Sequence, residues 1–278
     1  MADYVTFYGF SEDPFKNSPN PKFYFPAESH NEALSSLRYG ITERKGFILL
    51  LGERGIGKTT LVSTLISTLD APVKVAYIPR SNIPFKKLLR DTLKQLNLSA
   101  KLPFKGSMLH ELYYYLIACL ERDENVAIIL DEAHRIGVSV VEEVRLLANL
   151  ETSTTKLLQI VLCGKPELRE KMRADVIRQI GQRIAVTAQI NPMTEKESLQ
   201  YIDHRLKIVG SESSKVFTDE AAKMICKQAK GLPRAINILC SNALSVGCGL
   251  AEEKISAATV RKIRKAKGLL KDKTLQEL

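Results

Sequence analysis

The residues with the clearest chemistry form one glycine-rich stretch, Gly52-Glu53-Arg54-Gly55-Ile56-Gly57-Lys58-Thr59, followed by Thr60. The stretch matches the phosphate-binding pattern G-x-x-x-x-G-K-[ST] of a P-loop and directly follows the apolar run Phe47 to Leu51. Its glycines let successive backbone N–H groups turn toward phosphate oxygens, and the next helix adds a partial positive charge at its N-terminus. We expect residues 52–60 to bind ATP, with Lys58 at the β- and γ-phosphates, Thr59 on Mg²⁺ and Thr60 near the α-phosphate.

A second chemical signal is a pair of carboxylates, Asp131 and Glu132, at the end of the apolar run Val126 to Leu130. Asp131 is suited to be a Mg²⁺ ligand, and Glu132 to be the base that polarises the attacking water. Such a pair could merely cap a following helix, but a P-loop upstream favours nucleotide hydrolysis.

Asp131-Glu132-Ala133-His134 also spells the motif of one helicase superfamily. Those enzymes need two α/β motor domains, and this chain has the pattern of one, so we treat the match as coincidental. His134 is then either a polar residue near the γ-phosphate or a surface histidine.

The elements that must position these groups alternate between strand and helix as far as about residue 190. Short apolar runs predict strands at 47–51, 73–78, 126–130, 157–162 and 184–188. Helical spacing predicts helices at 31–43, 59–69, 85–96, 108–121, 140–150 and 167–182. After residue 193 the pattern predicts only helices, at 195–209, 219–229, 234–247 and 257–266. The fold class is therefore α/β, an αβα sandwich with a parallel sheet followed by an all-helical domain.

We divide the chain into four parts. Residues 1–30 are rich in proline and aromatic residues and predict an ordered arm packed on the main domain. Residues 31–191 form the α/β nucleotide-binding domain, with the boundary at Asn191-Pro192, and residues 192–267 form the helical domain. We predict residues 268–278 to be a basic tail because they continue the Lys- and Arg-rich stretch that starts at Arg261.

Composition limits the class of protein. With 278 residues, 45% hydrophobic and 26% charged, the chain can bury a globular core. No apolar run approaches the roughly 20 residues of a membrane span, and the N-terminus lacks the layout of a signal peptide. Five cysteines without a Cys-x-x-Cys spacing indicate reduced thiols rather than a zinc site. We therefore expect a cytoplasmic protein, and a net charge of +10 permits an anionic partner.

Several further stretches resemble the AAA+ P-loop ATPases, and specifically the ExeA-like (general secretion pathway protein A) family. The resemblance runs from Phe7 to about Arg264. Besides the P-loop, it is carried by Phe7-Tyr8-Gly9-Phe10, Asp13-Pro14-Phe15, Ser18-Pro19-Asn20-Pro21-Lys22-Phe23, His30-Asn31-Glu32-Ala33-Leu34, Cys163-Gly164-Lys165-Pro166-Glu167-Leu168, Arg178-Gln179-Ile180-Gly181-Gln182-Arg183 and Gly231-Leu232-Pro233-Arg234-Ala235-Ile236-Asn237. The fold it implies is an AAA+ domain followed by a helical lid.

The resemblance also implies a homo-oligomer, as a ring or a filament, that hydrolyses ATP where subunits meet. Arg183 matches the arginine that reaches the γ-phosphate of a neighbouring subunit, and Arg178 is the alternative. Arg234 matches the sensor arginine of the lid. Lys165 is a candidate γ-phosphate sensor, although many relatives carry glutamine at that position.

Two cellular roles follow from the resemblance. One is assembly of a secretion, pilus or envelope machine with a membrane-embedded partner at the inner membrane. The other is regulation of transposition or another transaction on double-stranded DNA. The net charge, the basic residues after Arg261 and the lack of a membrane span or peptidoglycan-binding module favour the second role, whereas the arm and core motifs favour the first.

Overall fold

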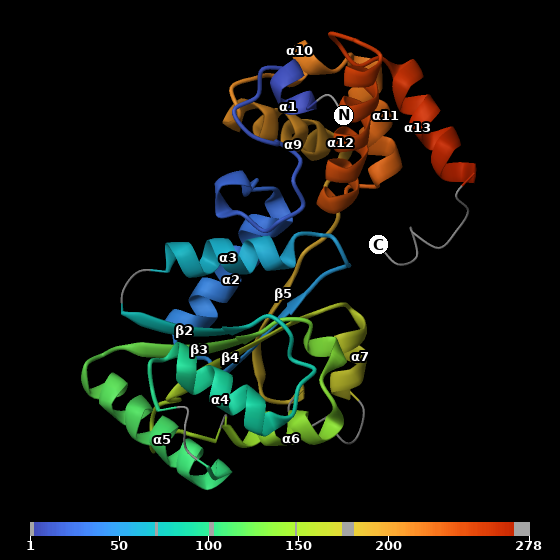
Figure 1. The fold of residues 1–278 in the computed structure, drawn as a ribbon. Coiled ribbons are helices and arrows are strands. Elements are labelled where there is room, and N and C mark those ends of the chain that lie inside the picture. The colour runs from blue at the N-terminus through green and yellow to red at the C-terminus, as the bar shows by residue number, and fades with distance from the viewer. Residues whose placement is uncertain (1–2, 70–71, 100–102, 148, 174–180, 270–278) are drawn as a thin grey trace. The chain divides into compact units, whose positions relative to one another are not determined.

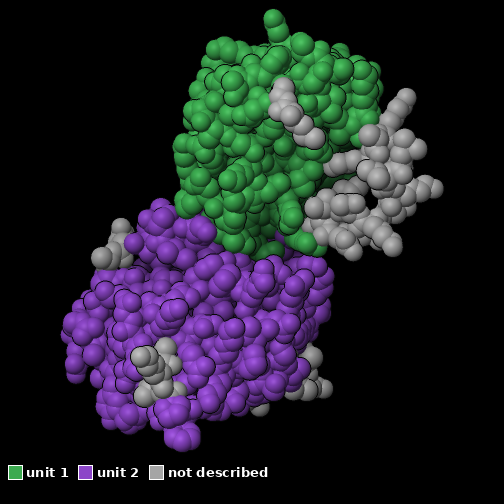
Figure 2. Space-filling view, in the orientation of Figure 1, with its two compact units in different colours: residues 1–27, 54–60, 191–278 green, residues 28–53, 61–190 purple. Residues whose placement is uncertain are grey.

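The computed structural model describes residues 3–69, 72–99, 103–147, 149–173 and 181–269. The chain divides into two compact units, shown in Figure 2. The α/β unit contains residues 28–53 and 61–190, and the helical unit contains residues 1–27, 54–60 and 191–278. Figure 1 labels most of the helices and strands of both units.

The α/β unit is built on a parallel sheet of five strands in the order β2-β3-β4-β1-β5. The strands are β1 (Phe47–Leu51), β2 (Val73–Ile78), β3 (Asn125–Leu130), β4 (Leu158–Gly164) and β5 (Ile184–Gln189). Every residue of β1, β3 and β4 is buried. A strand in the middle of a parallel sheet is covered on both faces, which is why these three strands are apolar except at Asn125 and Gln159.

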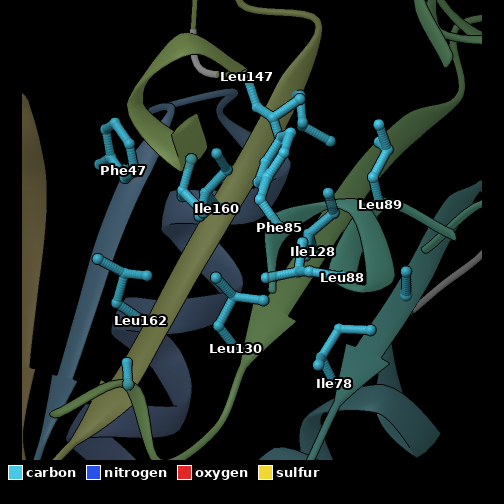
Figure 3. Packing of buried hydrophobic residues seen from close by; sticks show 14 of the residues in the cluster. Phe47, Ile78, Phe85, Leu88, Leu89, Ile128, Leu130, Leu147, Ile160 and Leu162 are labelled. Carbon is cyan, nitrogen blue, oxygen red and sulfur yellow. The ribbon is translucent and has the colours of Figure 1, made fainter. Parts of the chain in front are cut away.

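Helices cover both faces of this sheet (Figure 1). They are α2 (Glu28–Thr42), α3 (Lys58–Thr68), α4 (Phe85–Gln95), α5 (Lys105–Glu121), α6 (Val138–Leu147) and α7 (Glu167–Arg173). Alternate residues of β1, such as Phe47 and Leu49, join the apolar cluster formed with α4, α5 and α6, part of which Figure 3 shows. On the other face, a Cβ added to Gly40 of α2 would lie 2.7 Å from Cδ1 of Ile48. A side chain at position 40 would therefore require the Ile48 side chain to move.

The predicted αβα sandwich with a parallel sheet and a helical C-terminal region is confirmed. Two of the differences from the predicted bounds lie on the carboxyl side of β4. The strand predicted at 157–162 continues through Cys163 and Gly164, which pair with β1. The helix predicted at 167–182 is described as α7 up to Arg173, and residues 174–180 lie outside the described residues.

The helical unit consists mainly of α9 (Glu195–Ile208), α11 (Asp219–Ala229), α12 (Pro233–Gly249) and α13 (Ala257–Leu269), with the short helices α1 (Tyr4–Phe7) and α10 (Ser213–Val216). A capping box starts α9, in which Thr194 and Glu197 satisfy each other's backbone N–H groups.

The aromatic arm belongs to the helical unit. Phe10, Phe15 and Phe23 lie in one apolar cluster with residues of α9, α11 and α12. The sequence predicts an arm packed on the main domain, and the structure differs in this respect. A bundle of only a few helices buries little apolar area by itself. The arm adds large aromatic side chains to the core of these helices.

Candidate nucleotide-binding site

The carboxyl edge of the sheet gathers several of the predicted site residues. Strands of a parallel sheet end at the same edge, where ligands of α/β proteins commonly bind. Gly52 and Glu53 follow β1, Asp131 and Glu132 follow β3, and Lys165 follows β4, which lies between β1 and β3. The N–H of Gly52 donates to the carbonyl of Gly164 over 3.1 Å, so the pairing of β1 with β4 extends into the predicted P-loop.

Asp131 is buried, and hydrogen bonds hold both its carboxylate and its backbone. Its Oδ2 accepts from Tyr77 Oη at 3.0 Å, and its Oδ1 accepts from the N–H of Glu132 at 2.8 Å. Its carbonyl accepts from the buried Ser81 Oγ at 2.6 Å. Burial, and next the negative charge of Asp131, raise the pKa of the Tyr77 hydroxyl, so the phenol stays a neutral donor. The carboxylate of Asp131 therefore has a fixed orientation.

Tyr77 is itself fixed by the side chain of Gln95. The N–H of Tyr77 donates to Gln95 Oε1 at 2.8 Å, and Gln95 Nε2 donates to the carbonyl of Tyr77 at 2.7 Å. Because β2 is an edge strand, its outer backbone groups have no neighbouring strand. The amide of Gln95 takes that place at Tyr77. Sequence reasoning missed Tyr77, Ser81 and Gln95.

Glu132 stands in an uncommon backbone conformation, with φ at 54°. Its Oε2 lies 3.6 Å from both His134 Nε2 and Arg135 Nε. Only 14% of the His134 side chain is exposed, so the interpretation of His134 as a surface histidine is wrong. Two basic side chains thus lie beside the carboxylate of Glu132.

The remaining P-loop residues, 54–60, belong to the helical unit. Gly55 and Gly57 have φ values of 78° and 105°, which favour glycine. Lys58 is buried at the first position of α3. The N–H of Arg234, in the first turn of α12, donates to the carbonyl of Gly55 at 3.1 Å, while the Arg234 side chain is exposed. The structure thus brings Arg234 to the P-loop.

Arg183 lies away from these groups within the α/β unit. It directly precedes β5, whose first residue pairs with Phe47 at the start of β1. At about 3.3 Å per residue, the five residues of β1 separate that end of the sheet from Gly52 by about 16 Å. The Arg183 side chain is exposed and donates to Asn149 Oδ1. Arg178, the alternative, lies outside the described residues.

The predicted metal ligands suit Mg²⁺. No group of three or more His, Cys, Asp or Glu side chains that could hold a metal occurs among the residues that the structure describes. A threonine hydroxyl, Thr59, and one oriented carboxylate, Asp131, are the hard oxygen ligands that Mg²⁺ takes when substrate phosphates and water complete its shell. This donor set fits Mg²⁺ held together with a nucleotide.

Comparison with known families defines the class of this protein. Residues 41–172 match the family model described as an AAA domain, and the sheet and the helical region have the AAA+ arrangement. The chain therefore carries an AAA domain, as the P-loop and the strand pattern predict.

Comparison with an individual relative narrows the AAA class to one family. The chain is 36% identical over 253 residues to general secretion pathway protein A of Aeromonas hydrophila, an alignment that covers 91% of this chain and 46% of that protein. It thus spans about half the length of this relative. The predicted membership of the ExeA-like AAA+ ATPases is confirmed.

Solved structures show the same fold at low identity. The ORC2 protein of Aeropyrum pernix in ADPNP–ADP complexes has a TM-score of 0.67 and 18% identity, over 91% of this chain and 71% of that one. Drosophila ORC bound to DNA has a TM-score of 0.68 and 18% identity, over 93% and 64%. Within the part of the chain that the structure describes, no helix is both long and apolar enough to span a bilayer.

Proposed function

We propose that this AAA ATPase binds ATP with residues 52–60 and hydrolyses it with Glu132 as the base. The observation that carries the proposal is the fixed carboxylate of Asp131 beside Glu132 at the end of β3, in a chain that also presents a complete P-loop. Lys58 binds the β- and γ-phosphates, and Thr59 and Asp131 hold Mg²⁺. The metal, when bound, neutralises charge on the phosphates.

The P-loop assignment is tested by nucleotide binding. Lys58→Ala should remove measurable ATP binding in equilibrium dialysis, because Lys58 supplies the charge that faces the phosphates. Lys45→Ala is a control on a partly exposed lysine before β1, and it should bind ATP as the unchanged protein does. Tight ATP binding by Lys58→Ala would contradict the assignment.

Lys165 and Arg234 are proposed to sense the nucleotide. Lys165 follows β4, next to the strand that ends at Asp131, and a cation there can contact the γ-phosphate. The backbone of Arg234 already binds Gly55, so its guanidinium extends from a helix anchored to the P-loop. Either cation would stabilise charge on the phosphoryl oxygens.

We further propose that Arg183 acts on the site of a neighbouring copy in a homo-oligomer. Its place at the opposite end of the strands from Asp131 supports this, because an exposed arginine there cannot serve the carboxyl edge of its own sheet. In the neighbour's site the guanidinium would stabilise the charge that develops on the transferred phosphoryl group.

A mixing experiment separates action within a chain from action between chains. Glu132→Gln and Arg183→Ala should each be inactive alone. In an equimolar mixture, about a quarter of head-to-tail interfaces would combine an intact base with an intact arginine, and hydrolysis should return to about that fraction. A mixture that stays inactive would show that Arg183 serves its own chain or none.

For the cellular role we propose assembly of a secretion, pilus or envelope machine with a membrane-embedded partner. The 36% identity to general secretion pathway protein A supports it.

The alternative is a role on double-stranded DNA, and one surface of the α/β unit favours it. Lys86, Arg90 and Lys94 are exposed on α4 at i, i+4 and i+8, and among the described residues none has an ion-pair partner. A basic helix face of this kind suits phosphate contacts.

Hydrolysis measured with and without duplex DNA across a salt series distinguishes the two roles. If the DNA role is correct, DNA should stimulate turnover, the effect should fade as salt rises, and replacing the three α4 cations by glutamate should abolish it. Turnover indifferent to DNA at every salt concentration would leave the assembly role.

A further inference from the structure

Arg205 of α9 is a buried cation, 5% exposed, that binds the backbone of the arm. Its Nε donates to the carbonyl of Pro14, and its Nη2 donates to the carbonyl of Lys16 at 3.2 Å. Its guanidinium carbon also lies 4.5 Å from the ring centroid of Phe23. No carboxylate among the described residues forms an ion pair with it. A buried charge is costly, so its hydrogen bonds to the arm must compensate for lost hydration.

The same guanidinium starts a chain of hydrogen bonds toward α12. Its Nη1 donates to Tyr201 Oη at 2.7 Å, and Tyr201 Oη donates to Asn237 Oδ1 at 2.9 Å. Asn237 Nδ2 in turn donates to Asn17 Oδ1 of the arm at 3.4 Å. Tyr201 and Asn237 are both 5% exposed, so water does not compete for these bonds. The arm, α9 and α12 are thus joined by one polar network, which is buried at Arg205, Tyr201 and Asn237.

That network ends one helical turn from the P-loop. Asn237 stands three residues after Arg234, whose N–H binds the carbonyl of Gly55 at 3.1 Å. A Cβ added to Gly55 would lie 3.0 Å from the Arg234 Cβ, so the contact is close. All these residues lie in the helical unit. Two sequence stretches that resemble the family, in the arm and at 231–237, meet here.

We propose that Arg205 is a positioning residue that couples docking of the arm to nucleotide binding. The docked arm, through Tyr201 and Asn237, fixes the first turn of α12 against the P-loop. A nucleotide that orders residues 54–60 stabilises the same turn and, through the network, the arm. Coupling of this kind is reciprocal. The factor by which ATP strengthens docking of the arm must equal the factor by which the docked arm strengthens ATP binding. The inference rests on the proposed binding of ATP by the P-loop.

The test is hydrogen exchange of arm residues 10–17, read by mass spectrometry with and without MgATP, beside the ATP dissociation constant. In the unchanged protein MgATP should slow exchange of the arm. Arg205→Met should speed exchange, remove the effect of MgATP and weaken ATP binding about tenfold. Arg205→Lys keeps the charge without the planar fork and should fall between the two. Lys196→Met, on the exposed face of α9, is the matched control and should change neither quantity.

Tyr201→Phe separates coupling from folding and from docking. It keeps the ring and the Arg205 contacts to the arm carbonyls, but it removes the link to Asn237. The arm should stay docked well below the melting temperature, which falls because Arg205 and Asn237 each lose a buried hydrogen-bond partner, while protection of the arm by MgATP is lost. The coupling alone is overturned if MgATP still protects the arm in Tyr201→Phe. It is also overturned if the unchanged protein binds ATP but its arm exchanges equally fast with and without ATP. An unchanged protein that binds no ATP overturns the proposed function and the coupling together.

Discussion

Replacement of Gly231 by alanine should destabilise the fold at the start of α12 more than the same replacement of another glycine in the helical unit. Gly231 has φ at 73°, and an added Cβ would lie 2.1 Å from the carbonyl oxygen and 2.8 Å from the nitrogen of Met193. The left-handed conformation alone costs an alanine about 1–2 kcal/mol. Moving Met193 away also breaks its N–H bond to the Gly231 carbonyl, 3.0 Å long, which adds about 1–3 kcal/mol.

Gly210 provides the matched control. Its φ is 88°, but an added Cβ would meet no atom within 4 Å. Gly210→Ala should therefore lose only the conformational part, about 1–2 kcal/mol, against about 2–5 kcal/mol for Gly231→Ala. Urea unfolding followed by circular dichroism measures both, and the Gly231→Ala midpoint should be lower by about 1 M than that of Gly210→Ala. Equal midpoints would refute the contact between Gly231 and Met193 as the reason for this glycine.

Two further outcomes are expected. Tyr77→Phe removes the O–H that orients Asp131, so the Mg²⁺ concentration for half-maximal hydrolysis should rise about 10- to 100-fold. Tyr39→Phe, at an exposed ring, is the control and should leave that concentration unchanged. Equal Mg²⁺ concentrations for the two variants would show that the Tyr77 hydrogen bond does not orient Asp131. Burial raises the pKa of Cys226 to about 12, so between its ordinary value of 9.0 and that value the folded thiol keeps a proton that the unfolded one loses. Stability should therefore fall as pH rises above 9, with a shallower fall in Cys226→Ala, and an unchanged slope in that variant would contradict the raised pKa.

Sequence patterns predict the sheet well because its chemistry is local. β1, β3 and β4 are buried on both faces, so nearly all their residues are apolar, and the phosphate-binding glycines follow β1 in a fixed pattern. Asp131 and Glu132 could be recognised because they directly follow such a run. These inferences need only neighbouring residues.

The supports of the site could not be predicted, because they depend on contacts between distant segments. Tyr77 reads as an ordinary strand residue, and its role appears only when β2 pairs with β3 and places it beside Asp131, 54 positions away. Arg205 reads as a solvated helix residue, but it binds Pro14 of the arm across 191 positions. No spacing rule links residues so far apart. Pairing of β2 with β3 brings Tyr77 to Asp131, and packing within the helical unit brings Arg205 to Pro14.

The central claim is that Glu132 activates water on a nucleotide held by the P-loop. Its most direct test is hydrolysis of radiolabelled ATP by Glu132→Gln, measured with ATP binding on the same preparation. We expect that variant to bind ATP as tightly as the unchanged protein and to hydrolyse it at least a hundredfold more slowly, since general-base catalysis contributes about 10²–10⁴-fold. Normal turnover by Glu132→Gln would contradict the account.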